Sequence, residues 1–507
     1  MRELDPKSED LQKLLSFFNK GKFNNSEKLA LSITKKFPNH QFAWKVLGAT
    51  LEKKNKDFES LYAKKMAVKL IPNDIEALIN LANILYKLKN YKDAETNIKK
   101  VLKLNPNFAI AYCNLGNILQ KLDKFKDAEK NYLKAINLKP DLTDAYYNLA
   151  CNLEKMNRYS DALKNYKKAV KLNSKFAECY NNIGNVLLKL NKYEQAKNSY
   201  QKAINLESKN PEFLNNQGSV MRLLKEHSKA IEILEKAINL KPSFAEAYNN
   251  LALTYHDLGK LNEAKKSFKK SIDINKNFAL AYNSFGHFLY DTWRLDESEL
   301  NLKKAIKLKP KSSAFYSNLL FLKSLSSFYT SKHYEEAVTF GDKLNQDISS
   351  KYSKWLYKKN KKKLRIGFVS PDFKNHPVGL FLEGLLENFD RSSIELFAYS
   401  LDSKEDDFTK KLKPLFNNWR CLYNINDNDA AKIIYEDEIN ILIDLAGHTV
   451  NNRMVIFSKK PSPIQITWLG YWATSGLKEM DYIFGDPYVT PIGETEKFTE
   501  KVWRLPE

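Results

Sequence analysis

The chain of 507 residues and 58.8 kDa exceeds one ordinary hydrophobic core, so we expect more than one structural unit. Its net charge of +22 comes mostly from lysines spread along predicted helices, which indicates a solvated surface and disfavours nucleic acid as a partner. The four cysteines form no CxxC pair, the first residues are too charged for a signal peptide, and no apolar run reaches the about 20 residues of a membrane helix. We therefore expect a cytoplasmic protein without membrane segments or structural zinc.

A 34-residue internal repeat fills the first two-thirds of the chain. Two helices of a hairpin approach closely only where Gly or Ala removes a side chain, and a proline ends the second helix. Small residues recur at Gly116, Ala150 and Gly184, and prolines recur at Pro106 and Pro140. This period is typical of tetratricopeptide (TPR) repeats. We predict an α-solenoid over residues 7–345, with nine full units to residue 312 and a degenerate tenth.

One position on the inner face of the predicted solenoid is asparagine in most repeats. A carboxamide both donates and accepts hydrogen bonds, so a column of amides can bind the backbone of an extended acceptor protein. The alternative is that these side chains only bond neighbouring helices. The column, called the asparagine ladder below, comprises Asn80, Asn114, Asn148, Asn182, Asn216, Asn250 and Asn318.

The pattern changes after about residue 345. We predict a basic linker over 346–363, in which the KKNKKK run forms a solvated hinge. Short apolar strands then alternate with helices, which predicts a parallel, doubly wound, Rossmann-like α/β sheet over 364–507. The expected strands are 364–370, 394–400, 439–447, 464–470 and 481–486, and the expected helices are 378–389, 406–416 and 427–437.

Three loops at the carboxyl ends of these strands carry polar residues, and in this fold such loops hold the functional groups. A histidine beside glycine can transfer a proton or bind a phosphate or sugar, although a lone loop histidine is usually only a surface residue. Hydroxyls and free N–H groups suit phosphate or sugar oxygens. No Walker A, GxGxxG or HExxH motif is present, which disfavours a P-loop NTPase, a dinucleotide enzyme and a catalytic metal. The candidate residues are Asp372, Asn375, His376, Pro377, Gly379, Gly447, His448, Thr449, Thr474, Ser475 and Gly476.

Four segments in order, LRIGFVSPDFKNHPVG, ILIDLAGHTVNNRM, KPSPIQITWLGYWATSG and MDYIFGDPYVTP, resemble the catalytic region of the TPR-containing protein O-GlcNAc transferases. They are similar in style to the bacterial members and the plant SPINDLY branch. The resemblance implies an inverting glycosyltransferase of the two-lobed GT-B type. It would transfer a sugar from a nucleotide sugar, by default UDP-GlcNAc and alternatively a fucose donor, to Ser or Thr hydroxyls without a metal or other cofactor.

The resemblance also implies residue roles. His376 lies near the reacting groups, as proton acceptor or as organiser of the donor phosphate and acceptor hydroxyl, and His448 is a second catalytic candidate. Thr449 belongs to the same loop as His448, and Thr474, Ser475 and Gly476 to a third loop that binds substrate. Trp472 and Ala473 stand where relatives often have Pro-Gly, so the path of this third loop departs from the family pattern.

The chain ends at KVWRLPE, around the point where family members pass into a second lobe with most of the uridine and pyrophosphate contacts. We therefore expect that lobe to be absent, and the 507 residues alone to bind donor poorly and to turn over little. The alternative function is a TPR scaffold for protein–protein interactions, with a vestigial, inactive glycosyltransferase lobe.

Overall fold

The computed structural model describes residues 5–326, 331–347, 351–355, 363–493 and 495–505. The chain divides into two compact units, residues 1–186 and 187–507. Across the described ranges, no helix combines the length and the apolarity that crossing a bilayer requires.

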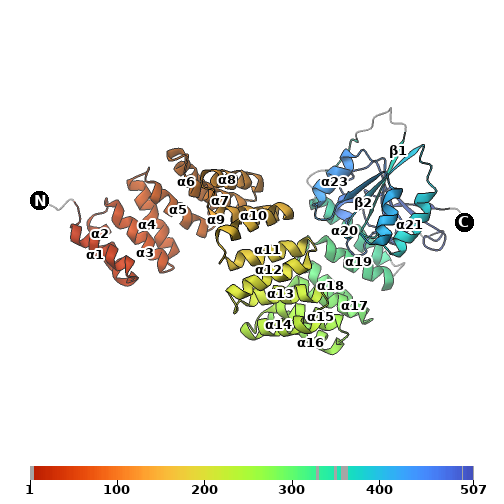
Figure 1. The fold of residues 1–507 in the computed structure, drawn as a ribbon, viewed down its shortest axis with the longest axis horizontal. Helices are drawn as coiled ribbons and strands as arrows, with labels where there is room; N and C mark the ends of the chain where they lie inside the picture. The colour runs from red at the N-terminus through yellow and green to blue at the C-terminus, as the bar shows by residue number, and fades with distance from the viewer. Residues whose placement is uncertain (1–4, 327–330, 348–350, 356–362, 494, 506–507) are drawn as a thin grey trace. The chain divides into compact units, whose positions relative to one another are not determined.

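Helical hairpins occupy residues 8–347 (Figure 1). First helices begin every 34 residues from Gln41, and second helices do so from Phe23 to Leu295, which confirms the predicted α-solenoid. The hairpins are α1 (Ser8–Asn19) and α2 (Phe23–Lys36), α3 (Gln41–Lys53) and α4 (Asp57–Leu70), α5 (Ile75–Lys87) and α6 (Tyr91–Leu104), α7 (Ala109–Lys121) and α8 (Phe125–Leu138), α9 (Thr143–Lys155) and α10 (Tyr159–Leu172), α11 (Ala177–Lys189) and α12 (Tyr193–Leu206), α13 (Pro211–Leu223) and α14 (His227–Leu240), α15 (Ala245–Asp257) and α16 (Leu261–Ile274), α17 (Ala279–Asp291) and α18 (Leu295–Leu308), and α19 (Ser313–Ser326) and α20 (Ser331–Asp347).

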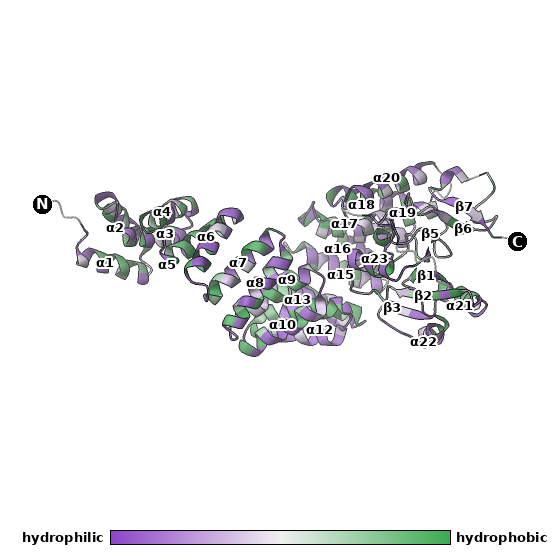
Figure 2. Cartoon of the chain, turned by 90° about the horizontal axis from the view of Figure 1, so that it is seen from above, coloured by the Kyte–Doolittle hydropathy of each residue, from purple (hydrophilic) through white to green (hydrophobic). Residues whose placement is uncertain are grey.

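Close helix crossings explain the small residues of the repeat. A Cβ atom added to Gly116 on α7 would lie 2.5 Å from the ring of Tyr132 on α8, which is itself fully buried. Figure 2 shows that the helices carry hydrophilic and hydrophobic residues side by side, as amphipathic packing requires. A residue with positive φ lies just after each of nine first helices, namely Gly21, Asn55, Lys89, Asp123, Asn157, Asn191, Lys225, Gly259 and Trp293.

Residues 364–504 form a seven-stranded parallel sheet in the order β3-β2-β1-β4-β5-β6-β7, which confirms the predicted α/β class. Three elements were not predicted from the sequence, the strands β3 and β7 and the short helix α24 (Met454–Phe457). The strands are β1 (Leu364–Ser370), β2 (Ile394–Ser400), β3 (Asn418–Cys421), β4 (Ile441–Asp444), β5 (Ile464–Thr467), β6 (Tyr482–Gly485) and β7 (Lys501–Arg504), and the other helices are α21 (Pro377–Glu387), α22 (Asp407–Leu412) and α23 (Asp427–Glu436), with 3₁₀ turns at Lys413–Leu415 and Thr495–Lys497.

The two faces of the sheet bury different elements. Phe368 of β1 belongs to a core that includes Leu382 of α21. The neighbouring Val369 faces the other way, into a core shared with α23 and with Phe315 and Phe340 of the last solenoid hairpin. Packing therefore crosses the sequence boundary at residue 345, and the second compact unit joins the later repeats to the sheet.

Part of the predicted linker packs against the sheet region. The ring of Tyr352 stacks on Tyr435 with 4.1 Å between centroids, and the Trp355 indole N–H donates to the carbonyl of Lys460 at 3.0 Å. Residues 356–362, which include most of the predicted KKNKKK hinge, lie outside the described residues.

Candidate functional site

The candidate site lies where the strand order reverses. Strand β1 is flanked by β2 on one side and by β4 on the other. Ligands of open parallel sheets bind outside the carboxyl ends of the strands at such a switch point. The loops 371–376 and 445–453 follow β1 and β4, so His376 and His448 both belong to loops at this position.

His376 caps the helix that follows β1. Its Nδ1 atom accepts a hydrogen bond from the backbone N–H of Val378 at 3.2 Å, which satisfies an otherwise unpaired donor in the first turn of α21. An acceptor Nδ1 leaves the proton of the neutral ring on Nε2. The side chain is 41% exposed, so Nε2–H can donate to a ligand oxygen.

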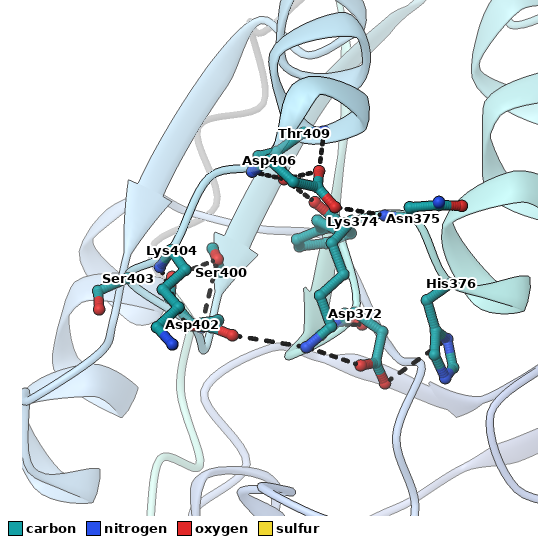
Figure 3. A network of polar contacts seen from close by, with 12 residues as sticks. Asp372, Lys374, Asn375, His376, Ser400, Asp402, Ser403, Lys404, Asp406 and Thr409 are labelled. Carbon is teal, nitrogen blue, oxygen red and sulfur yellow. Dashed lines mark hydrogen bonds and ion pairs between the residues drawn. The ribbon is translucent and has the colours of Figure 1, made fainter. Parts of the chain in front are cut away.

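Carboxylates hold the His376 loop in place (Figure 3). Asp372 lies 4.0 Å from His376 Nδ1 and also pairs with Lys374 at 3.5 Å. Asp406 accepts from the backbone N–H of Asn375 at 2.9 Å and caps α22. A Cβ atom at Gly379 would lie 2.4 Å from the carbonyl oxygen of Lys374, so glycine allows the loop to lie against the helix.

His448, by contrast, is buried. Its Nδ1 lies 3.1 Å from the hydroxyl of Ser317 on α19, and its Nε2 lies 3.0 Å from the carbonyl of Ser475. Since the carbonyl can only accept, Nε2 carries the proton and Nδ1 accepts from the hydroxyl. Burial lowers the pKa of the ring to about 3. Proton transfer to substrate does not suit a neutral ring with both nitrogens bonded and no access to solvent, so this geometry argues against the predicted catalytic role and assigns His448 to the contact between solenoid and sheet.

We expect the stability of the second unit to depend on pH through His448. The unfolded ring has an ordinary pKa of about 6.5, so between pH 6.5 and 3 the unfolded state binds more protons than the folded state. The contribution is present above pH 6.5 and is lost as pH falls, by up to about 1.4 kcal/mol per pH unit.

The measurement is urea unfolding of the wild type and of His448→Gln from about pH 7.5 to 4.5. The stability difference in favour of the wild type should stay nearly constant down to about pH 6.5 and shrink as the pH falls further. Burial raises the pKa of Asp444 to about 7, which acts with the opposite sign, but this effect is common to both proteins and cancels in the difference. A difference that stays constant with pH contradicts the prediction.

Asp444 shapes the loop that carries His448. Its buried carboxylate accepts from the backbone N–H groups of Ala446 at 3.1 Å and of Gly447 at 2.7 Å. Gly447 has φ +55°, and a Cβ atom there would lie 2.2 Å from Tyr471 Cβ. The Thr449 hydroxyl donates back to the carbonyl of Ala446 at 2.7 Å. Gly447 and Thr449 therefore complete a compact turn.

A buried carboxylate also organises the Thr474–Gly476 loop. The Glu500 side chain, in a residue only 4% exposed, accepts from the Thr474 hydroxyl at 2.7 Å, from the Ser475 backbone N–H at 2.8 Å and from the Ser475 hydroxyl. Both hydroxyls predicted to bind substrate are thus buried and bonded within the chain, which favours a structural role for them.

The same loop docks against the solenoid. A Cβ atom at Gly476, where φ is +74°, would lie 2.1 Å from the carbonyl oxygen of Ala337 on α20. Trp472 lies 6.0 Å from the ring of Phe321 on α19, and its indole N–H donates to the carbonyl of Ser324 at 3.4 Å. The departure of this loop from the family pattern at Trp472 therefore serves a contact with the last hairpin.

The asparagine ladder lies on the first helices and is half-buried. The amide N–H of Asn148 contacts Cys113 Sγ at 3.6 Å, and that of Asn182 donates to the Tyr147 hydroxyl at 3.0 Å. Each partner lies 35 residues earlier, on the first helix of the preceding repeat, and Asn250 and Asn318 repeat the arrangement with Asn215 and Asn283 at 2.8 Å. These bonds are the ones that the alternative interpretation of the ladder predicted.

The predicted sheet residues thus fall into two groups. Asp372, Asn375, His376 and Pro377 lie in or beside the partly exposed loop after β1, with Gly379 buried beneath it. The second group is buried apart from the half-buried Thr449, and it comprises Gly447, His448, Thr449, Thr474, Ser475 and Gly476. Sequence reasoning missed two buried acids, Asp444 and Glu500. Asp444 could have been found, because an acidic residue at the end of an apolar strand is unusual, but no local sequence signal marks Glu500. Within the described part of the chain, no group of three or more His, Cys, Asp or Glu residues is placed to hold a metal ion.

Comparisons with known protein families match the repeats and the sheet region separately. Residues 341–507 match Glycosyl transferase family 41. Tetratricopeptide repeat families match residues 75–108, 109–142, 153–191, 184–224, 218–259 and 245–278.

Individual relatives agree with the family match. The probable UDP-N-acetylglucosamine–peptide N-acetylglucosaminyltransferase SPINDLY of Oryza sativa is 34% identical over 196 residues, 38% of this chain and 21% of its own. The corresponding transferase of Caenorhabditis elegans is 40% identical over 149 residues, 29% of this chain and 13% of its own. A solved mutant of the Thermobaculum terrenum O-GlcNAc transferase has 26% identity and a TM-score of 0.52, covering 58% of this chain and 57% of its own.

The chain thus spans about a fifth or less of the length of these two curated relatives. The residues matched by the family model include all four motifs on which the resemblance to the O-GlcNAc transferases was based. The resemblance is therefore confirmed. The chain joins tetratricopeptide repeats to a region that matches glycosyl transferase family 41.

Proposed function

We propose that this chain belongs to a protein O-glycosyltransferase, which transfers a sugar from a nucleotide sugar to Ser or Thr hydroxyls of proteins bound by the solenoid. The observation that carries the proposal is the family 41 match over residues 341–507, whose candidate loops follow β1 and β4 at the switch point of the sheet. GlcNAc is the default sugar because the names of the curated relatives specify it, and fucose is the second candidate. We place the reaction in the cytoplasm, which the free cysteines favour.

In such a transfer the acceptor hydroxyl oxygen forms a bond to C1 of the sugar, while the bond from C1 to the diphosphate breaks. The hydroxyl proton passes to an oxygen of the leaving diphosphate or to solvent, and negative charge grows on that diphosphate. His376 fits the second event, because its Nε2–H can donate to a phosphate oxygen while Nδ1 caps α21. Of the two roles considered for His376, we therefore favour the organiser of donor phosphate and acceptor hydroxyl.

Nucleotide-sugar binding tests this proposal. The chain labelled with ¹⁵N-histidine is titrated with UDP-GlcNAc and, separately, with GDP-fucose. Because the 507 residues alone are expected to bind donor poorly, we expect weak but saturable movement of the His376 ring signals with one of the two at high donor concentration, assigned by their loss in His376→Gln. Since His448 is buried and bonded through both nitrogens, its signals serve as the internal control. Saturable binding of neither donor overturns the proposal for this chain.

We also propose that the asparagine ladder binds the backbone of the acceptor protein. The bonds between repeats orient the amides of Asn148, Asn182, Asn250 and Asn318 and use one of the two N–H groups of each, and an amide also has a carbonyl that can accept. The ladder can therefore stabilise the solenoid and bind a peptide at the same time.

The combined variant Asn114→Ala, Asn148→Ala and Asn182→Ala is expected to weaken binding of an unstructured Ser- and Thr-rich peptide at least about tenfold. Fluorescence anisotropy measures the affinity. Loss of the bonds from Asn148 and Asn182 to the preceding repeat should cost about 1 kcal/mol each, so unfolding is measured alongside. The matched control is Asn131→Ala with Asn165→Ala, on second helices, where each amide donates at 2.8 and 2.9 Å to the carbonyl of its own helix. Equal affinities of variant and control would sink the ladder hypothesis.

A further inference from the structure

One turn of the solenoid contacts the sheet region far from the last hairpin. The turn Lys189–Tyr193 joins α11 to α12, and its Asn191 has φ +56°. The Asn191 amide donates to the hydroxyl of Ser403 at 3.4 Å, and the Tyr423 hydroxyl donates to the carbonyl of Lys189 at 3.0 Å. These residues belong to the second compact unit, so the contacts are internal to it.

Tyr193 strengthens this contact. Its hydroxyl donates to Asn191 Oδ1 at 2.8 Å, and the ammonium group of Lys404 lies 5.3 Å from the centre of its ring. Burial and then the charge of Asp402 raise the pKa of the Tyr193 hydroxyl. The turn therefore contacts the loop 401–406, which follows β2.

The loop 401–406 in turn touches the loop of His376 (Figure 3). Asp402 accepts from the backbone N–H of Lys404 at 3.0 Å through Oδ1, and its Oδ2 lies 3.4 Å from the ammonium of Lys374. Lys374 lies between two carboxylates, because Asp372 is 3.5 Å away on the other side. Contacts thus run from Tyr193 through Lys404, Asp402 and Lys374 to Asp372.

The Nδ1 atom of His376 has two possible hydrogen-bond partners. Its Nδ1 can accept from Val378 N–H, as observed at 3.2 Å, or it can carry the proton and donate to Asp372, which lies 4.0 Å away. The second arrangement gains a charge-assisted hydrogen bond but loses the helix cap. Lys374 neutralises the charge of Asp372 and so disfavours the second arrangement. The first arrangement is the one that leaves Nε2–H free to donate to a ligand.

We propose that the solenoid turn Lys189–Tyr193 positions the loop 401–406, so that Asp402 and Lys374 hold Asp372 and keep the proton of His376 on Nε2. Lys374 and Asp402 are positioning residues, and Asn191 and Tyr193 connect them to the repeats. The consequence for catalysis rests on the role of His376 in the proposed function, but the tautomer itself does not.

The test is the tautomer of His376 in the full chain without any nucleotide sugar, measured from the coupling pattern of its ring ¹⁵N and ¹H signals. Wild-type protein should have mainly Nε2–H, and Lys374→Met should convert most of the population to Nδ1–H. Lys374→Arg keeps the charge and should restore the wild-type pattern. The double variant Asn191→Gly and Tyr193→Leu should shift the population in the same direction but less far. Glycine is chosen because it accepts the positive φ.

The matched control is the same turn one repeat earlier, Asn157→Gly with Tyr159→Leu. There the Tyr159 hydroxyl donates to Asn157 Oδ1 at 2.9 Å, and Asn157 has φ +58°. The control should leave the His376 tautomer unchanged. An unchanged tautomer in Lys374→Met, or in the Asn191 and Tyr193 variant, overturns the proposal. Because the readout needs no donor, failure of nucleotide-sugar binding would count against the proposed function alone.

Discussion

Replacement of Glu500 by Ala is expected to destabilise the second unit by about 3–5 kcal/mol. The carboxylate accepts from the Ser475 N–H and from the hydroxyls of Thr474 and Ser475, and all of these donors are buried. Its removal leaves the Ser475 N–H and hydroxyl without an acceptor in a buried region, whereas the Thr474 hydroxyl keeps its contact with the Thr499 hydroxyl at 2.9 Å. Because His448 donates to the carbonyl of Ser475, the same change should loosen the contact with the last solenoid hairpin.

Hydrogen exchange is the suitable measurement for Glu500, since a chain of two units need not unfold in one step. Peptides covering residues 470–480 should lose protection in Glu500→Ala, whereas peptides from the first unit should not change. Glu500→Gln is the matched control, because it keeps the shape and one acceptor oxygen, and we expect it to cost about 1–2 kcal/mol. Equal protection in Glu500→Ala and wild type contradicts the structural role.

Replacement of His376 is expected to lower sugar transfer about 10²–10³-fold relative to the low rate expected of the wild-type chain, because a donor to the developing charge on the leaving diphosphate is lost. His376→Ala also removes the Nδ1 cap of α21, which should cost about 1 kcal/mol of stability. A drop in activity with alanine alone therefore does not separate chemistry from folding.

His376→Asn separates the two effects. Asparagine is a good N-cap, so the variant should retain the stability of α21 but lose the Nε2–H donor. We expect transfer, assayed with a bound acceptor protein, to fall as far as in His376→Ala, while the thermal transition stays close to that of wild type. Wild-type rates in His376→Asn would show that the residue only caps the helix.

Hydrophobic patterning predicted the elements that have strong local signals. The strand Leu364–Ser370 was predicted with its observed bounds, because a continuous apolar run must be buried on both faces of a parallel sheet. The strand Asn418–Cys421 was missed, since it lies at the edge of the sheet and its burial is partial. Edge strands need little apolar sequence, and their pairing is decided by the neighbouring strand.

The sequence predicted where the candidate residues lie in the fold, but not whether their side chains are buried or exposed. The sequence placed His376 and His448 in loops at the carboxyl ends of two predicted strands, and both loops do lie at the switch point. It could not show that one imidazole is 41% exposed at a helix cap while the other is buried between Ser317 and Ser475. That difference comes from residues 131 and 27 positions away in the chain.

The sequence by itself determined the repeat period, the order of βα units and the family motifs, because each depends on residues within one hairpin or one loop. Tertiary structure alone decided which polar residues meet solvent. Glu500 bonds the Thr474–Gly476 loop, Gly476 lies against Ala337, and the turn at Asn191 reaches Ser403. These contacts join segments that are distant in sequence, and their energies depend on burial and geometry that no local pattern encodes.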